Sequence, residues 1–208
     1  MAPPLQLTAD TFRRTALTLA AEDVTLAGIV ERHGLPTFWS RQPGFQTLLL
    51  LILEQQVSLA SAKAAFDRVN GRLGGVSAER LLELSDAELR ADGFSRQKTR
   101  YARALAAAIL EGSLEIERLE RLDDDAVRAA LVELPGIGAW TAEVYLLSAL
   151  RRPDTWPAGD LALQQAAREV LGLETRPSST ELDVIGERWR PHRATAARLL
   201  WHLYLSVR

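Results

Sequence analysis

The chain has 208 residues, of which 47% are hydrophobic and 25% are charged, a balance typical of a globular protein and not of a disordered one. It contains no cysteine, which excludes disulfide bonds, thiolate metal sites and cysteine nucleophiles, and fits a reducing cytoplasm. The net charge of −2 does not by itself indicate a nucleic-acid partner, but residues 93–103 carry four basic side chains and no acid.

Apolar residues recur with helical spacing along most of the chain, whereas the first 20 residues are ambiguous. Their threonine-rich segment fits a short strand or a loop. Two capping-box pairs, Ser85 with Glu88 and Ser178 with Glu181, mark helix starts. No segment shows the sustained alternation of a strand, so we predict an all-α fold. The predicted helices span about 22–33, 44–56, 58–73, 77–84, 86–92, 96–111, 124–133, 139–150, 161–172, 179–189 and 193–207.

Nothing in the sequence indicates a membrane. The N-terminal segment lacks the basic region and apolar run of a signal peptide. The longest apolar run, residues 48–53, is far shorter than the ~20 residues that span a bilayer. We therefore expect a cytoplasmic protein with no membrane partner.

Residues 134–138 read LPGIG and lie between two predicted helices. Gly136 and Gly138 permit backbone conformations that side chains forbid, and they let another chain approach closely. The helix that follows leaves its first amides unpaired at the positive end of its dipole, and such a place binds anions such as phosphate. A tight turn between two helices, with no ligand, explains the same residues, and the glycines alone do not decide.

The surroundings of this turn resemble a known family. LVELPGIGAWTAEVYLLSAL resembles the helix-hairpin-helix element of the HhH-GPD superfamily of base-excision DNA glycosylases. About 20 residues further on, WPAGDLALQQA resembles its Gly/Pro…Asp element. The C-terminal ERWRPHRATAARLLWHLYL resembles the last helices of the alkylation-repair branch, the DNA-3-methyladenine glycosylase II type. The match runs in order over roughly residues 22–208.

The resemblance implies a helical fold of two lobes. We expect residues 45–156 to form the lobe with the hairpin, and residues 157–208 to form a C-terminal lobe with the catalytic aspartate. Residues 1–44 are expected to pack with that second lobe. Because only about 40 residues precede the first recurrent helices, we expect the N-terminal β-rich domain of longer relatives to be absent.

The function implied is that of a monofunctional DNA glycosylase of base excision repair. It would flip an alkylated base out of duplex DNA and hydrolyse its N-glycosidic bond. The expected bases are 3-methyladenine and 7-methylguanine, with N1- or N3-alkylated or etheno bases as a further hypothesis. The implied partner is damaged double-stranded DNA, bound by a monomer that requires no cofactor. Relatives with lyase activity have a lysine at the position of Trp140, and tryptophan cannot form a Schiff base, so no lyase activity is expected.

Asp160, at the start of the predicted helix 161–172, is the candidate catalytic residue. Cleavage of a glycosidic bond builds positive charge on the sugar, and a fixed carboxylate stabilises that charge and can orient a water. Aspartate is also a common helix N-cap, and the two roles are compatible. Asp154 lies six residues earlier and lacks the matching context.

The resemblance also implies a base pocket and a wedge. Trp140, Trp201 and Val144 would line the pocket, where Trp201 would attract a cationic alkylated purine. For each of the two tryptophans, the alternative is a ring buried in the core. Gln56, supported by Gln55, would fill the gap that the flipped base leaves, and the alternative is a polar turn residue without DNA contact.

The other aromatic residues and the contacts to the DNA backbone have the following expected roles. Trp156 and Trp189 are assigned mostly to the core, whereas the role of Trp39 and Phe38 stays open. The resemblance also implies a monovalent cation, sodium or potassium, bound to the carbonyls of Val132, Leu134 and Ile137. The residues expected to hold the DNA backbone are Leu134, Gly136, Gly138, Thr141, Arg96, Lys98, Arg193 and Arg198.

Two other classes of function remain open from the sequence. A non-catalytic helix-hairpin-helix module that binds DNA or docks on a repair complex needs the LPGIG turn but not Asp160. An all-α protein–protein adaptor needs neither feature. Release of bases from methylated DNA separates the enzyme from both, because only the enzyme liberates a base.

Overall fold

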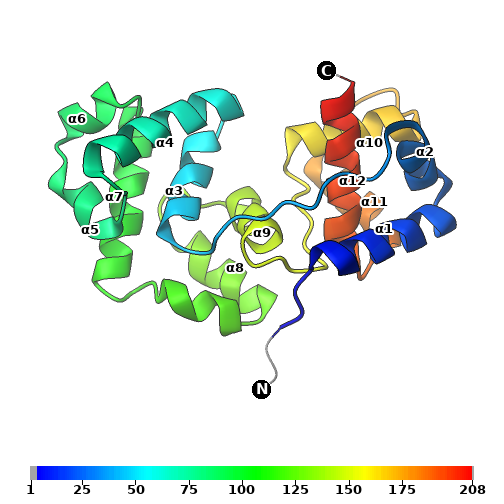
Figure 1. Cartoon of the computed structure of the whole chain (residues 1–208), viewed down its shortest axis with the longest axis horizontal. Coiled ribbons are helices and arrows are strands. Elements are labelled where there is room, and N and C mark those ends of the chain that lie inside the picture. The colour runs from blue at the N-terminus through cyan, green and yellow to red at the C-terminus, as the bar shows by residue number, and fades with distance from the viewer. Residues whose placement is uncertain (1–3, 208) are drawn as a thin grey trace. The chain divides into compact units, whose positions relative to one another are not determined.

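The computed structural model describes residues 4–207, and every regular element among them is a helix (Figure 1). This confirms the all-α prediction. None of these helices is both long and apolar enough to cross a membrane. The α-helices are α1 (Ala9–Glu22), α2 (Val24–His33), α3 (Phe45–Glu54), α4 (Leu59–Leu73), α5 (Ala78–Glu83), α6 (Asp86–Ala91), α7 (Arg96–Leu110), α8 (Asp124–Val132), α9 (Ala139–Ser148), α10 (Leu161–Leu171), α11 (Ser179–Gly186) and α12 (Arg193–Ser206). Two short 3-10 helices span Ile116–Arg121 and Glu187–Trp189.

The alternatives of strand or loop for the N-terminal segment are wrong, because this segment forms α1. Thr8 caps the helix: its hydroxyl accepts from the Thr11 amide at 3.2 Å, and the Thr11 hydroxyl accepts from the Thr8 amide at 2.8 Å. Phe12, Ala16 and Leu19 are buried on one face at helical spacing. Packing of this apolar face therefore outweighs the weak helix propensity of the threonines.

The chain divides into two compact units. Unit 1 is built mainly from Arg41–Tyr145, and unit 2 combines Leu5–Ser40 with the chain from Leu146 onward. Along the chain, unit 1 ends at Tyr145, within α9, and unit 2 resumes at Leu146. The prediction from the sequence places this boundary after residue 156. The reason is packing, because Leu147 and Trp156 are buried in the core of unit 2.

The core of unit 1 lies among α3, α4, α5, α6 and α7. Buried apolar residues that lie one turn apart form part of it, such as Leu49 and Leu53 of α3 and Ala102 and Ala106 of α7. Serine N-caps begin α4 through α7, so each of these short helices has a side-chain acceptor for its first amides. The Ser85–Glu88 capping box is confirmed.

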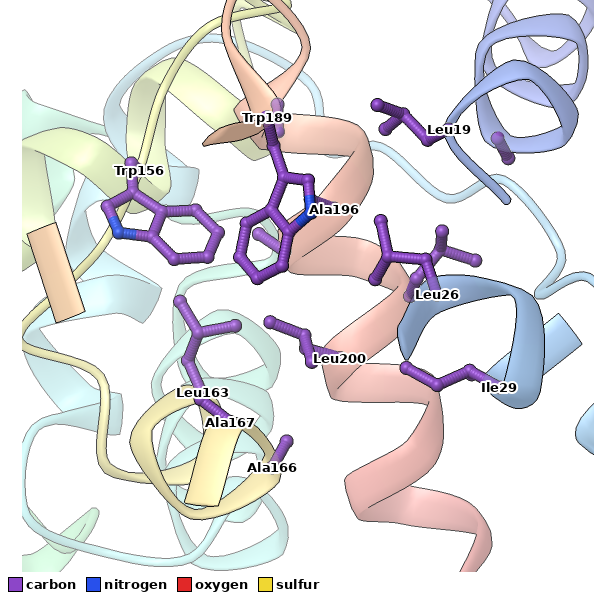
Figure 2. Close-up of a cluster of buried hydrophobic side chains, with 14 of the residues drawn as sticks. Leu19, Leu26, Ile29, Trp156, Leu163, Ala166, Ala167, Trp189, Ala196 and Leu200 are labelled. Carbon is purple, nitrogen blue, oxygen red and sulfur yellow. The ribbon is translucent and has the colours of Figure 1, made fainter. Parts of the chain in front are cut away.

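The core of unit 2 surrounds α12, which packs against α1, α2 and α10. Figure 2 shows the indoles of Trp156 and Trp189 next to each other, with Leu163 and Leu200 packed close by. The two ring centroids are 5.4 Å apart. Trp189 Nε1 donates to the Asp23 carboxylate at 2.9 Å, so its polar atom is satisfied inside the core. The assignment of both tryptophans to the core is confirmed.

Candidate functional site

The LPGIG turn connects α8 to α9 within unit 1. α8 ends at Val132, and the Ile137 amide donates to the Leu134 carbonyl at 3.0 Å, which closes a tight turn. α9 then begins at Ala139, one residue after Gly138, which is exposed. The first amides of α9 therefore follow directly on an open glycine, which is the geometry that the sequence predicts for a phosphate site.

Gly136 is required at its position for two separate reasons. Its φ of 88° lies in the left-handed region, which side chains rarely adopt. The Tyr101 ring of α7 also lies against it, and a Cβ on Gly136 would come within 2.1 Å of Tyr101 Cγ. Tyr101 thus fixes the turn against α7, and no feature of the local sequence around either residue reveals this contact.

Gln55 joins the turn to the C-terminal end of α3. Its side-chain amide donates to the Gly136 carbonyl at 2.8 Å and to the Thr141 hydroxyl at 3.1 Å. Thr141 is buried, so this bridge lies beneath the outer surface of the turn. Gln55 therefore holds the hairpin in place, as a supporting residue would.

Gln56, the predicted wedge, is exposed in the connection between α3 and α4. Its φ is 57°, a left-handed conformation that costs a non-glycine residue of order 1 kcal/mol. Lys98 Nζ donates to the Leu53 carbonyl at 2.6 Å and so secures the end of α3 just before this connection. Gln56 is thus an exposed residue in a strained conformation, directly after Gln55, whose side chain is bonded to the hairpin.

Trp140 and Val144 lie one turn apart on α9 in unit 1. Trp140 is half-buried, whereas Val144 is buried. They share one face of the helix because they are four residues apart. That these two side chains line the pocket for a flipped base stays a prediction.

Asp160 belongs to unit 2 and begins α10. Its Oδ1 accepts from the Leu163 amide at 2.8 Å, which is the expected N-cap bond. The same oxygen accepts from Trp201 Nε1 of α12 at 2.9 Å. The carboxylate is half-buried and is fixed by a backbone amide and an indole, so two elements of unit 2 orient it.

Residues 49–191 match the family model of the HhH-GPD superfamily of base excision DNA repair proteins. The chain belongs to this superfamily. The solved structure of the Schizosaccharomyces pombe 3-methyladenine DNA glycosylase Mag1, in complex with abasic DNA, is similar with a TM-score of 0.83 and 26% identity, over 90% of this chain and 95% of that one. A DNA-3-methyladenine glycosidase from Bacillus halodurans is similar with a TM-score of 0.76 and 32% identity, over 90% of this chain and 87% of that one.

A further relative is longer than this chain. The Bacillus subtilis protein YfjP is 27% identical over 185 residues, a match that covers 85% of this chain. The same match spans 64% of the length of YfjP. The family model thus covers residues 49–191 of this chain, and a part of YfjP has no counterpart in its match.

Asp154, which lies six residues before Asp160 and lacks the motif context of that residue, has a structural role. The Asp154 carboxylate is held by Arg193, with Nε–Oδ1 at 2.9 Å and Nη2–Oδ2 at 3.0 Å, and by Arg190 Nη1 at 2.6 Å. This network ties the loop before α10 to the start of α12. Asp154 is thus engaged in ion pairs with two arginines, whereas the Asp160 carboxylate accepts from a backbone amide and an indole.

Two of the arginines expected to contact phosphate are buried, which corrects their assignment. Arg193 is 9% exposed and its guanidinium is paired with Asp154, so its charge is neutralised inside the fold. Arg198 is 2% exposed and donates to the carbonyls of Trp39 at 2.8 Å and Leu147 at 3.0 Å. A basic side chain contacts a DNA phosphate only where it reaches the surface, and neither of these does.

The two basic residues of α7 differ from each other. Arg96 is exposed at the first position of the helix, so it is available to a phosphate. Lys98 is half-buried, and burial lowers the pKa of its ammonium group. Because Lys98 already donates to the Leu53 carbonyl, its first role is to support the connection that carries Gln56.

Proposed function

We propose that this chain is a monofunctional DNA glycosylase that hydrolyses the N-glycosidic bond of alkylated bases in duplex DNA. The observation that carries the proposal is the Asp160 carboxylate, fixed at the start of α10 by the Leu163 amide and the Trp201 indole. Membership of a DNA-repair superfamily supports it, as does the likeness to Mag1, which was solved in complex with abasic DNA. An abasic site is the product that such hydrolysis leaves in the strand.

The reaction requires one carboxylate and one water. As the bond between the sugar C1′ and the base nitrogen breaks, its electron pair leaves with the base and positive charge builds on the sugar. The Asp160 carboxylate stabilises this charge, and water then adds to C1′ and loses a proton. An N3- or N7-alkylated purine already carries a positive charge, so it leaves as a neutral base without a dedicated acid.

The hairpin binds the DNA backbone, and the Gln56 side chain inserts into the base stack. The amides of Gly136, Gly138 and Thr141 bind a backbone phosphate, and Arg96 adds a second contact. Extrusion of the base costs a few kcal/mol for unstacking. The exposed Gln56 side chain then fills the gap that the base leaves in the stack. Duplex DNA with an alkylated base is the proposed partner, bound by a single copy of the chain.

We further propose that the hairpin holds a monovalent cation, sodium or potassium. Val132 is the last residue of α8, where helix carbonyls are unsatisfied and the dipole is negative. The Leu134 carbonyl accepts one bond from the Ile137 amide and retains a second lone pair. The carbonyls of Val132, Leu134 and Ile137 would form the ligand set, and replacing potassium by a bulky organic cation at constant ionic strength is expected to weaken DNA affinity.

The absence of lyase activity rests on Trp140. Its side chain has no amine, so it cannot form the Schiff base that precedes strand cleavage. Incubation with an abasic duplex and borohydride is therefore expected to trap no covalent complex. A trapped complex would contradict this part of the proposal.

The test of the proposed function is release of free base from duplex DNA methylated in vitro, followed by chromatography. The wild-type chain is expected to release 3-methyladenine and 7-methylguanine and to bind DNA with an affinity that falls steeply with salt. Salt-dependent binding without release would favour a non-catalytic hairpin module. The absence of both would favour a protein–protein adaptor.

A further inference from the structure

Unit 2 carries an exposed tryptophan next to the Asp160–Trp201 pair. Trp39 lies in the connection after α2 and is 39% exposed, so part of its side chain is accessible to a ligand. Its ring centroid is 6.1 Å from that of Trp201, with an angle of 39° between the planes. Trp201 in turn donates to Asp160 at 2.9 Å. Asp160, Trp201 and Trp39 therefore form one continuous row of contacts.

Arg198 fixes the position of Trp39. The guanidinium carbon lies 4.5 Å from the centroid of the Trp39 ring and 4.8 Å from that of Phe38. Arg198 Nη1 also donates to the Trp39 carbonyl at 2.8 Å, so both the ring and the backbone of this residue are held. Burial lowers the pKa of Arg198 to about 10, which leaves it cationic at neutral pH.

The two tryptophans have opposite electrostatic surroundings. The N–H of Trp201 donates to a carboxylate, which enriches its ring and favours contact with a cation. Trp39 already has the Arg198 cation against its ring, which disfavours a second cation on the same indole. Trp39 thus offers stacking area to an uncharged ring and little attraction to a charged one.

We propose that Trp39 is a specificity-determining residue that extends the base-binding surface beyond Trp201 and favours neutral, ring-extended bases, with Arg198 as its positioning residue. The inference rests on the proposed glycosylase function. A neutral base is a poorer leaving group than a cationic methylpurine, so its release depends more on the binding surface. Loss of Trp39 therefore affects the two classes of base unequally.

The experiment compares single-turnover release of 1,N6-ethenoadenine and of 7-methylguanine from otherwise identical duplexes. Trp39→Ala is expected to slow release of the neutral base by about tenfold or more, as loss of one aromatic stacking contact does, and to slow release of the cationic base much less. Trp39→Phe should lie between. The Trp39 carbonyl remains in both variants, so the bond from Arg198 is preserved. Leu205→Ala, at an exposed position of α12, is the control and should leave both rates unchanged.

Arg198→Lys tests the positioning role. Lysine keeps the charge but cannot donate to the Trp39 and Leu147 carbonyls in the same way. It is expected to change the ratio of the two release rates in the direction of Trp39→Ala. A lower melting temperature with an unchanged ratio would show a purely structural role and overturn this part of the inference.

Calorimetric titration with free 1,N6-ethenoadenine separates the inference from the proposed function. If the wild type binds the free base and Trp39→Ala does not, while no base is released from DNA, the role of Trp39 in binding the base stands and the glycosylase function is wrong. If the wild type releases both bases and Trp39→Ala leaves their ratio unchanged, the inference is wrong and the glycosylase function stands. Neither release nor binding by the wild type would overturn both.

Discussion

The hairpin of unit 1 and the carboxylate site of unit 2 are built in different ways. The hairpin presents backbone atoms, and its shape depends on Gly136, on the Tyr101 ring and on the Gln55 amide. The carboxylate site presents a side chain that an N-cap bond and an indole hold. Folding and function therefore depend on the same atoms at the hairpin, whereas at Asp160 the charge can be removed while the supporting bonds stay.

Gly136→Ala is expected to have the largest effect. It forces a side chain into the left-handed region and against the Tyr101 ring, which together cost about 2–5 kcal/mol of unfolding free energy. Because the distorted atoms are those proposed to bind DNA, affinity should fall together with stability. Chemical denaturation and DNA-binding titrations measure the two effects.

Gly112→Ala is the matched control for this prediction. Gly112 has a φ of 76°, and a Cβ there meets nothing within 4 Å. It should cost only the ~1–2 kcal/mol of the backbone conformation and leave DNA affinity unchanged. Equal losses in the two variants would show that the contact with Tyr101 is unimportant, and Tyr101→Ala in the Gly136→Ala background should recover part of the stability.

Arg193→Ala and Arg96→Ala are expected to have opposite profiles. Arg193 is buried against Asp154, so its loss should lower the free energy of unfolding by about 2–3 kcal/mol and leave the salt dependence of DNA affinity unchanged. Arg96 is exposed, so its loss should leave stability unchanged and reduce the slope of log affinity against log salt by about 1. A reduced slope in Arg193→Ala would contradict the structural role assigned to it.

Substitutions of two adjacent glutamines are expected to have smaller effects on stability, and the two effects differ in direction. Gln55→Ala removes two hydrogen bonds to the hairpin and should lower stability by about 1–2 kcal/mol. Gln56→Gly relieves the left-handed strain and should leave stability unchanged or raise it by up to about 1 kcal/mol. Base release should nevertheless slow in Gln56→Gly, because this variant lacks the side chain proposed to fill the gap left by the flipped base. Normal release by that variant would remove Gln56 from base flipping.

The sequence predicts what depends on local pattern and fails where distant residues decide. The helices, the Ser178–Glu181 capping box and the N-cap position of Asp160 follow from short-range spacing, and the structure confirms them. The contact of Tyr101 with Gly136 and the burial of Arg198 depend on packing between separate elements. Arginine is usually exposed, so a sequence pattern alone favours a DNA contact for a residue that the fold encloses.

The most direct measurement is single-turnover base release by Asp160→Asn, with Asp154→Asn as the control. Asparagine is as good an N-cap as aspartate, and its amide oxygen can accept from Leu163 and Trp201, so only the negative charge is lost. We predict release at least about 100-fold slower with unchanged DNA affinity, whereas Asp154→Asn should lower the melting temperature and keep its release rate. Release by Asp160→Asn at the wild-type rate would contradict the assignment of Asp160 as the catalytic carboxylate.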